Sequence, residues 1–398
     1  MIKQFTFRKR MAATLVASAC GFCLAPSVSM AAEADIAKLL DSLEKELATL
    51  KAQAAKPAPE SATAGGKAVA LSSTDGITIY GRVDLVVENS NDGKVARNVL
   101  QNISSRIGFK GERKLTDGLT GLMQIETGVA PDDSAQSKTF ASRNSFVGLR
   151  SQSLGSLIAG THDMPFKKLE GTASPMWGSA EAMEILLHGK GTARVVATMN
   201  DLHTRQKNVV QYWSPKFSNI EVKLAYAPDE VNGAAGTQRK PVYGASVEFD
   251  NKMWNVGLAT ETQKKFTATN GDMTGLKATA GMKRGAATFG VGYSKLDNNS
   301  GKKTNNWLIA GSYEFGPTIL KANCGKSSES SSGAQDGLKM FGVELDYPLD
   351  KYTTLYGYYT TITNEANARG RFEAGDNKYS PVAGDDPRAL GIGVRYNF

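Results

Sequence analysis

Residues 390–398 read LGIGVRYNF and alternate strictly between large apolar side chains and small or polar ones. One face of this segment carries Leu390, Ile392, Val394, Tyr396 and Phe398. The other face carries glycine, arginine and asparagine. Because successive side chains of a β-strand point to opposite faces, this period of two predicts a strand with one apolar and one polar surface.

The same period recurs along the chain from residue 76. In residues 77–87, ITIYGRVDLVV, one side carries Ile77, Ile79, Val83 and Leu85, and the other carries Thr78, Tyr80, Arg82 and Asp84. Most such segments have about nine to twelve residues, the length that a tilted strand needs to cross a bilayer. Sixteen are predicted: 76–88, 99–112, 118–128, 140–150, 155–163, 207–214, 219–227, 240–249, 253–262, 274–284, 286–296, 304–314, 317–327, 338–346, 352–362 and 387–398.

Short and long connections alternate between these segments. The short ones are 111–117, 151–155, 214–219, 249–253, 315–317 and 346–351, and the long ones include 89–97, 129–139, 163–206 and 363–387. An even number of strands with this alternation is typical of an outer-membrane barrel. Nothing after residue 31 has the ~20 consecutive apolar residues of a spanning helix. We therefore predict an all-β, 16-stranded antiparallel transmembrane β-barrel.

Aromatic residues gather near the predicted strand ends: Tyr80, Tyr212, Trp213, Tyr226, Tyr347, Tyr352, Tyr396 and Phe398. Such residues favour the interface between lipid and water, so they predict an interfacial girdle. The alternative is ordinary cross-strand aromatic pairing.

The glycines of 281–292 lie in a predicted strand pair, where they let large neighbours pack, and not at a nucleotide-binding turn.

The first 75 residues predict export and a short extension. Residues 1–31 have a basic start, an apolar stretch and a small-residue cleavage site after Ala31, as in a signal peptide. Residues 32–54 predict a short periplasmic coiled-coil helix, the alternative being an amphipathic helix that lies on another surface. Its apolar seam is Ile36, Leu40, Leu43, Leu47 and Leu50, with Ala54 next in the repeat. Residues 55–75 predict a flexible linker before a barrel of residues 76–398.

Charge and cysteine content exclude several classes. The formal net charge of +8 falls to +4 once the four basic residues of the leader are removed, which is too mild to indicate nucleic-acid binding. Only Cys324 remains after the leader, so neither an intramolecular disulfide nor a cysteine metal cluster is expected. No motif for an esterase, a zinc protease or a phosphate loop is present, so we predict no enzyme and no cofactor.

Several stretches resemble the general trimeric porins of Gram-negative outer membranes. They are 79–84 (IYGRVD), 105–111 (SRIGFKG), 118–119 with 124–126 (GL and QIE), 142–149 (SRNSFVGL), 208–215 (NVVQYWSP) and the terminal 396–398 (YNF). The resemblance implies a homotrimer among outer-membrane lipids that passes ions and small solutes. It also implies that Phe398 signals to the barrel-insertion machinery, while the extension would meet a periplasmic partner.

The family's third long loop folds inward and narrows the pore, and here it would span about residues 163–206. The alternation of faces along each strand places Arg82, Arg106 and Lys110 inside the barrel, and the resemblance adds Arg143. The predicted acidic wall residues are Asp84 and Glu126. The predicted loop charges are Asp163, Lys167, Lys168, Glu170, Glu181 and Glu184. Charges of both signs across a narrow pore orient water and bias ion passage.

One position departs from the family pattern. Thr161 stands where the fifth strand usually carries a basic residue, so the charge arrangement at the constriction differs.

His162, His188 and His203 all fall in or beside the loop, but their spacing matches no metal-ligand motif, so no metal is predicted. Three functions remain open: a passive, weakly ion-selective diffusion channel, a substrate-selective porin, or a structural barrel that anchors the coiled coil.

Overall fold

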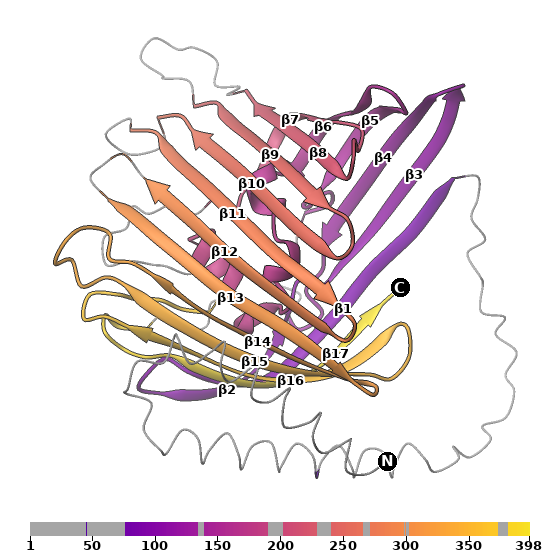
Figure 1. Cartoon of the computed structure of the whole chain (residues 1–398). Coiled ribbons are helices and arrows are strands. Elements are labelled where there is room, and N and C mark those ends of the chain that lie inside the picture. Colours follow the sequence, from indigo (N-terminus) through magenta and orange to yellow (C-terminus); the bar gives the residue numbers. More distant parts are fainter. Residues whose placement is uncertain are drawn as a thin grey trace, which may run out of the picture.

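The computed structural model describes residues 76–133, 139–189, 202–228, 240–265, 271–297, 302–372 and 381–398, with Lys45 and Asn299. These residues form one antiparallel sheet of seventeen strands that closes on itself, because β1 pairs with β17 as well as with β2 and β3 (Figure 1). The strands are β1 (Ile77–Asn91), β2 (Ala96–Asn102), β3 (Arg106–Thr116), β4 (Leu119–Gly128), β5 (Ser145–Ser151), β6 (Gly155–Asp163), β7 (Arg205–Trp213), β8 (Ile220–Ala227), β9 (Val242–Asp250), β10 (Trp254–Gln263), β11 (Met273–Arg284), β12 (Ala287–Asp297), β13 (Lys303–Phe315), β14 (Thr318–Ser327), β15 (Leu338–Pro348), β16 (Thr353–Asn364) and β17 (Arg388–Asn397).

Strands β2 and β3 are two halves of one crossing. Both pair with β1, β2 along Leu85–Asn91 and β3 along Ile77–Arg82. The chain bends between them at Ser104, whose φ of 55° interrupts the extended backbone. The barrel therefore has sixteen crossings, which confirms the number predicted from the period-two segments.

Several predicted boundaries differ from those of the structure. Residues 89–97 were expected to form a long connection, but β1 runs to Asn91 and β2 starts at Ala96. The Asp92 carboxylate closes the intervening turn by accepting hydrogen bonds from the backbone N–H groups of Lys94 (3.0 Å) and Val95 (2.8 Å). The predicted fourth strand also begins later than expected, at Ser145 instead of residue 140.

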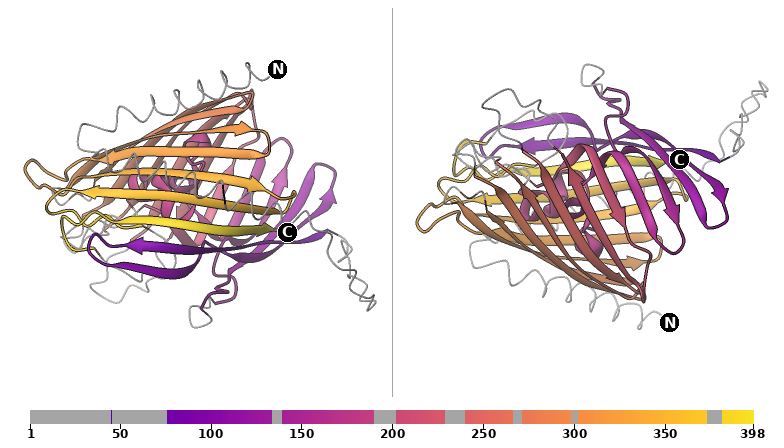
Figure 2. Two further views of the ribbon diagram at one scale, coloured as in Figure 1. Left: turned by 90° about the horizontal axis from the view of Figure 1, so that it is seen from below. Right: turned by 90° about the horizontal axis from the view of Figure 1, so that it is seen from above.

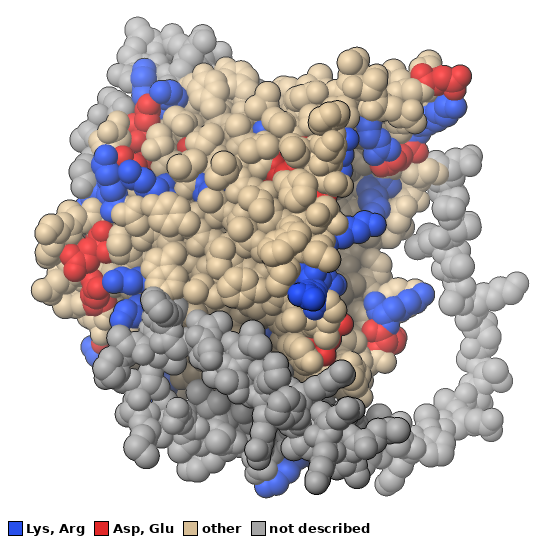
Figure 3. Space-filling model, viewed as in Figure 1, with Lys and Arg blue, Asp and Glu red and all other residues tan. Residues whose placement is uncertain are grey.

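The two faces of the sheet divide as the alternation predicts. Large exposed apolar side chains project outward, among them Val83, Val87, Leu258, Ile392 and Val394. In the space-filling view, uncharged side chains cover the middle of the outer surface and charged ones gather toward its margins (Figure 3). Only a closed barrel lets strands satisfy every backbone hydrogen bond in hydrocarbon, so this band matches the lipid-facing zone of a transmembrane barrel.

The aromatic girdle prediction is wrong for two residues. Tyr80 points inward and donates a hydrogen bond to Glu126 (3.0 Å). Trp213 also lies on the inner face, where its indole N–H reaches Gln211 (3.1 Å). The exposed aromatic side chains near strand ends include Tyr212, Tyr226, Tyr352, Tyr396 and Phe398. Two adjacent aromatic residues, such as Tyr212 and Trp213, cannot share one face of a strand.

Short helical turns occur in the connection between β6 and β7. They are α3 (Pro165–Lys168), η2 (Gly171–Ala173), η3 (Gly178–Ala180) and the π-helical turn η4 (Met183–Leu187). Among the described residues no helix is long and apolar enough to cross a membrane. The predicted signal peptide, coiled-coil seam and linker lie outside the described residues, except for Lys45, which is helical.

Candidate functional site

Residues 164–189, here called the inward loop, lie inside the ring of strands. Figure 2 shows this magenta segment within the barrel in both views. Its turns contact the inner faces of neighbouring strands: α3 lies on β9 and β10, η2 on β11 and β12, η4 on β13, and η3 on β15 and β16. The loop therefore covers one side of the interior.

Glycines on the wall let the loop approach closely. A Cβ atom at Gly290 would lie 2.5 Å from the backbone of Thr172, and one at Gly292 would lie 2.4 Å from Leu187. Gly325 is similarly close to Leu186, at 2.5 Å. These positions have room for a hydrogen atom only, which confirms for Gly290 and Gly292 that glycine makes space for neighbouring groups.

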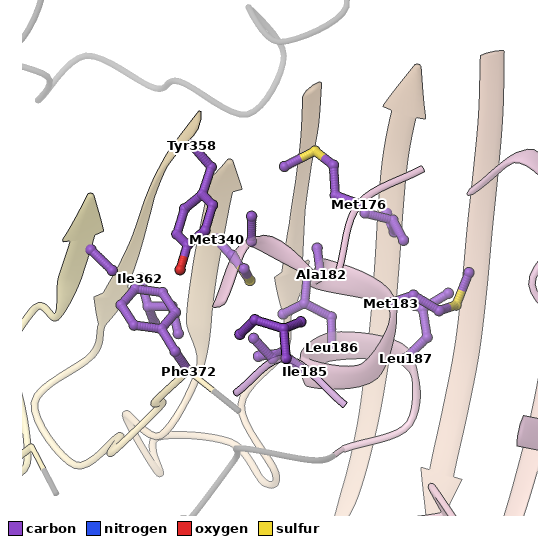
Figure 4. Packing of buried hydrophobic residues seen from close by; sticks show 14 of the residues in the cluster. Met176, Ala182, Met183, Ile185, Leu186, Leu187, Met340, Tyr358, Ile362 and Phe372 are labelled. Carbon is purple, nitrogen blue, oxygen red and sulfur yellow. The ribbon is translucent and has the colours of Figure 1, made fainter. Parts of the chain in front are cut away.

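Apolar side chains hold the loop against the wall. Met183, Ile185, Leu186 and Leu187 are at most 1 % exposed and pack with residues of β13, β15 and β16 (Figure 4). Phe166 and Leu202 belong to a second cluster with residues of β10, β11 and β12. Burying each such side chain contributes about 1.5–3 kcal/mol, so these contacts stabilise the loop against this side of the barrel.

Arg82, Arg106, Lys110 and Arg143, here called the basic wall, lie on the opposite side of the interior, on β1, β3 and the segment before β5. Glu126 of β4 lies at its centre and accepts from Arg143 Nε at 2.5 Å, while Arg106 Nε lies 3.8 Å from the same carboxylate. The side chains of Arg106 and Arg143 are 19 % and 24 % exposed. Two arginines share one carboxylate, so this group keeps one net positive charge.

Arg82 connects this basic wall to the loop. Its guanidinium lies 5.1 Å from the centre of the Trp177 ring, and its Nε donates to Asn397 Oδ1 at 3.0 Å. A guanidinium over an indole face is a favourable cation–π contact. Trp177 therefore brings the loop to the same wall that carries Arg106 and Arg143.

A second charged group surrounds Asp163 at the start of the loop. Lys167 Nζ lies 2.8 Å from the carboxylate and Arg205 Nη2 lies 3.0 Å from it. Arg205, the first residue of β7, pairs with Asp163 across the strands. The basic residue expected at Thr161 is absent, and Arg205 supplies a cation at Asp163, two residues farther along the strand. No spacing in the sequence pointed to Arg205.

The other predicted site residues are placed as follows. Lys110 is exposed on the inner face and its ammonium lies 5.4 Å from the Tyr80 ring centre. Glu181 is 4 % exposed and accepts from Ser174 Oγ. Glu184 pairs with His203 at 3.2 Å. Loop carboxylates were expected to face the wall arginines. Instead, Arg106 and Arg143 contact Glu126, which belongs to the wall itself.

Burial also shifts the pKa of two ionisable groups in the inward loop. It lowers the pKa of the Lys167 ammonium, against the opposing effect of Asp163. It raises the pKa of the Glu170 carboxyl, against the effect of nearby Lys168 and Lys277. Both shifts follow from the cost of holding a charge away from water.

The prediction that Asp84 lines the pore wall is wrong in one respect. Asp84 points inward but is 0 % exposed, so it does not contact channel water. Arg395 Nε donates to it at 2.8 Å and the Tyr356 hydroxyl donates at 2.5 Å. These three residues come from β1, β17 and β16, so the carboxylate joins the first strand to the last two. Parity identified the faces of Asp84 and Arg395, but it gave no sign that they were partners.

The three histidines occupy two places. His162 packs against Phe146 and Trp213, with ring centres 5.4 and 5.3 Å away. His188 and His203 contact each other through their Nδ1 atoms at 3.1 Å. Within the described part of the chain, no group of three or more His, Cys, Asp and Glu side chains is arranged to hold a metal ion.

Comparison with known proteins agrees with this architecture. The family model described as Gram-negative porin matches residues 52–367. An outer membrane porin protein of Bordetella pertussis is 25 % identical over 356 residues, covering 76 % of this chain and 84 % of the relative. The major outer membrane protein P.IB of Neisseria gonorrhoeae is 26 % identical over 178 residues, covering 42 % of this chain and 48 % of the relative. The chain thus matches about half the length of that Neisseria relative.

Solved structures share the fold. An anion-selective porin from Comamonas acidovorans superposes with a TM-score of 0.66 at 19 % identity, covering 81 % of this chain and 99 % of the other. OmpT of Vibrio cholerae, in a trimer form, has a TM-score of 0.60 at 16 % identity, covering 81 % of this chain and 99 % of the other. With the closed barrel and the match over most of its length, the chain belongs to the Gram-negative porin family.

Proposed function

We propose that this outer-membrane porin forms a water-filled channel for the passive diffusion of ions and small hydrophilic solutes. The observation that carries the proposal is the partial exposure of Arg106 and Arg143, at 19 % and 24 %, on the inner face of a closed barrel. Such exposure is expected of side chains that line a water-filled lumen.

The channel is weakly selective and prefers anions. Arg106 and Arg143 outnumber Glu126, and Arg82 and Lys110 add further positive charge to the same wall. Fixed charges that line a pore raise the local concentration of the opposite ion and lower that of the like ion. The resemblance in fold to an anion-selective porin supports this preference, although it is too distant to carry individual residues over.

Planar-bilayer recording tests the proposal directly. Purified chain should produce stepwise conductance that rises in proportion to bulk salt conductivity, and a KCl gradient should give a small reversal potential of the anion-selective sign. Current that saturates with one solute, or is blocked by it, would indicate the substrate-selective alternative. Absence of conductance from correctly folded protein would contradict the channel function.

A homotrimer and a periplasmic extension complete the proposal. The trimer form of one solved neighbour and the apolar outer band support self-association within the membrane. Residues 1–31 would be removed on export, and residues 32–54 would then associate in the periplasm, next to a linker of residues 55–75. Deleting residues 32–75 should leave conductance unchanged; a weakened cell envelope in that deletion would favour the structural-anchor function.

A further inference from the structure

The chain Lys277–His188–His203–Glu184, here called the histidine relay, joins the end of the inward loop to the barrel wall. Lys277 Nζ lies 2.6 Å from His188 Nε2, and the two Nδ1 atoms of the histidines are 3.1 Å apart. His203 Nε2 lies 3.2 Å from Glu184 Oε1. Four side chains from β11, the loop and the segment before β7 are thus connected end to end.

With Lys277 as an ammonium, one proton arrangement satisfies the three contacts of the relay. A lysine ammonium can only donate, so His188 Nε2 must accept, and the proton of this ring is on Nδ1. His188 Nδ1–H then donates to His203 Nδ1, which places the proton of His203 on Nε2. That N–H donates to the Glu184 carboxylate, which can only accept. In this arrangement both rings are neutral, and they are opposite tautomers.

The relay also satisfies a buried cation. Lys277 is 0 % exposed, and its ammonium lies 4.8 Å from the Phe166 ring centre. A buried ammonium without an acceptor is costly, so the His188 lone pair stabilises Lys277 while it fixes the loop. The relay therefore depends on His188 staying neutral.

Protonation of either ring breaks the arrangement. A second proton on His188 would place an N–H against the Lys277 ammonium, and a second proton on His203 would place one against His188 Nδ1–H. Charged groups surround both ends of the relay, and Lys167 and Glu170 lie within electrostatic range of Glu184. Glu170, Glu248 and Glu261 lie within electrostatic range of Lys277, and so does Lys167. Glu261 is itself held by Thr204 (2.7 Å) and Gln263 (2.9 Å).

We propose that the histidine relay is an acid-released fastening of the inward loop, so that acidification loosens the loop and increases channel closures. This rests on the proposed channel function. At neutral pH the relay keeps the loop against the wall. When the relay takes up a further proton, the loop end leaves Lys277 and enters the lumen intermittently, which interrupts the current.

Single-channel recording of the full chain in 1 M KCl, between pH 7.5 and pH 5.5, tests the proposal. Closures should be severalfold more frequent at pH 5.5 than at pH 7.5, because acidification adds a proton to the relay. The double variant His188→Gln/His203→Gln should stay quiet at both values, because a glutamine amide can accept and donate along the relay without titrating. Lys277→Met should close frequently even at pH 7.5.

His162→Gln is the matched control, because His162 lies outside the relay and should leave the response to pH intact. A response that survives in the double variant, or disappears in His162→Gln, would overturn the proposal. So would equal closure rates of the parent chain at pH 7.5 and pH 5.5.

A second measurement does not depend on conduction. ¹⁵N NMR of histidine-labelled protein in detergent distinguishes the two ring tautomers, and the single variants His188→Gln and His203→Gln assign the signals. At pH 7.5 we expect an Nδ1–H tautomer for His188 and an Nε2–H tautomer for His203. Identical tautomers would reject the relay itself, whereas a correct relay in a chain without conductance would reject only the channel function.

Discussion

Ion selectivity should respond in opposite directions to two changes at the basic wall. Glu126→Gln removes the carboxylate shared by Arg106 and Arg143, so it raises the net charge of that group by one unit. Arg106→Gln with Arg143→Gln lowers the charge by two units. Both sets of side chains lie on the inner face, and those of the two arginines are 19 % and 24 % exposed.

The size of the effect follows from Coulomb's law in a water-filled lumen. A unit charge acts on an ion ~5 Å away with about 0.8 kcal/mol in water, reduced to about 0.5 kcal/mol at 0.1 M salt. That energy enriches anions about twofold and depletes cations about twofold, which changes their permeability ratio about fivefold per unit charge. At 1 M salt the same charge changes the ratio less than about twofold, because the Debye length falls to ~3 Å.

Reversal potentials in KCl gradients measure this ratio. We expect Glu126→Gln to strengthen anion preference about fivefold at low salt, and the double arginine variant to shift it toward cations by about 25-fold. Asp272→Asn is the control, since that carboxylate pairs with Lys264 in the connection between β10 and β11. If both wall variants shifted selectivity in the same direction, or neither did, the basic wall would not line the conducting path.

Three further outcomes concern assembly and packing. Deleting Phe398, whose backbone N–H and C=O pair with Gly81 of β1, should lower the amount of barrel inserted into the membrane, while the channels that do insert conduct normally; equal membrane levels of variant and parent would refute this. Asp84→Asn should weaken the closing strands by about 1.5–3 kcal/mol, because buried Arg395 loses the carboxylate 2.8 Å away and keeps the more distant Asp346 at 3.7 Å, and heat-modifiable migration on gels should then be lost at lower temperature. Gly290→Val should displace the inward loop, because its Cβ would meet the Thr172 backbone, and single-channel conductance should change while the barrel remains heat-modifiable; an unchanged conductance would mean that the loop does not set the pore.

The strands could be predicted from sequence because their signal is local. A lipid face and an inner face impose a period of two on each crossing, so Leu390–Phe398 and Ile77–Leu85 reveal their orientation without any partner. The same rule placed Arg82 and Arg106 inside the barrel. The predicted placement was wrong at Tyr80 and Trp213, because their aromatic character near a strand end was given more weight than the alternation of faces along the strand.

Contacts between distant parts of the chain were decided only by the tertiary structure. Asp84 meets Arg395 because the first and last strands pair to close the barrel, and no spacing in the sequence encodes that register. Glu126 meets Arg143 across the connection between β4 and β5, and Lys277 meets His188 because the inward loop packs on β11. Periodicity determines which face a side chain occupies, whereas the partner of a charge depends on barrel closure and on where the inward loop packs.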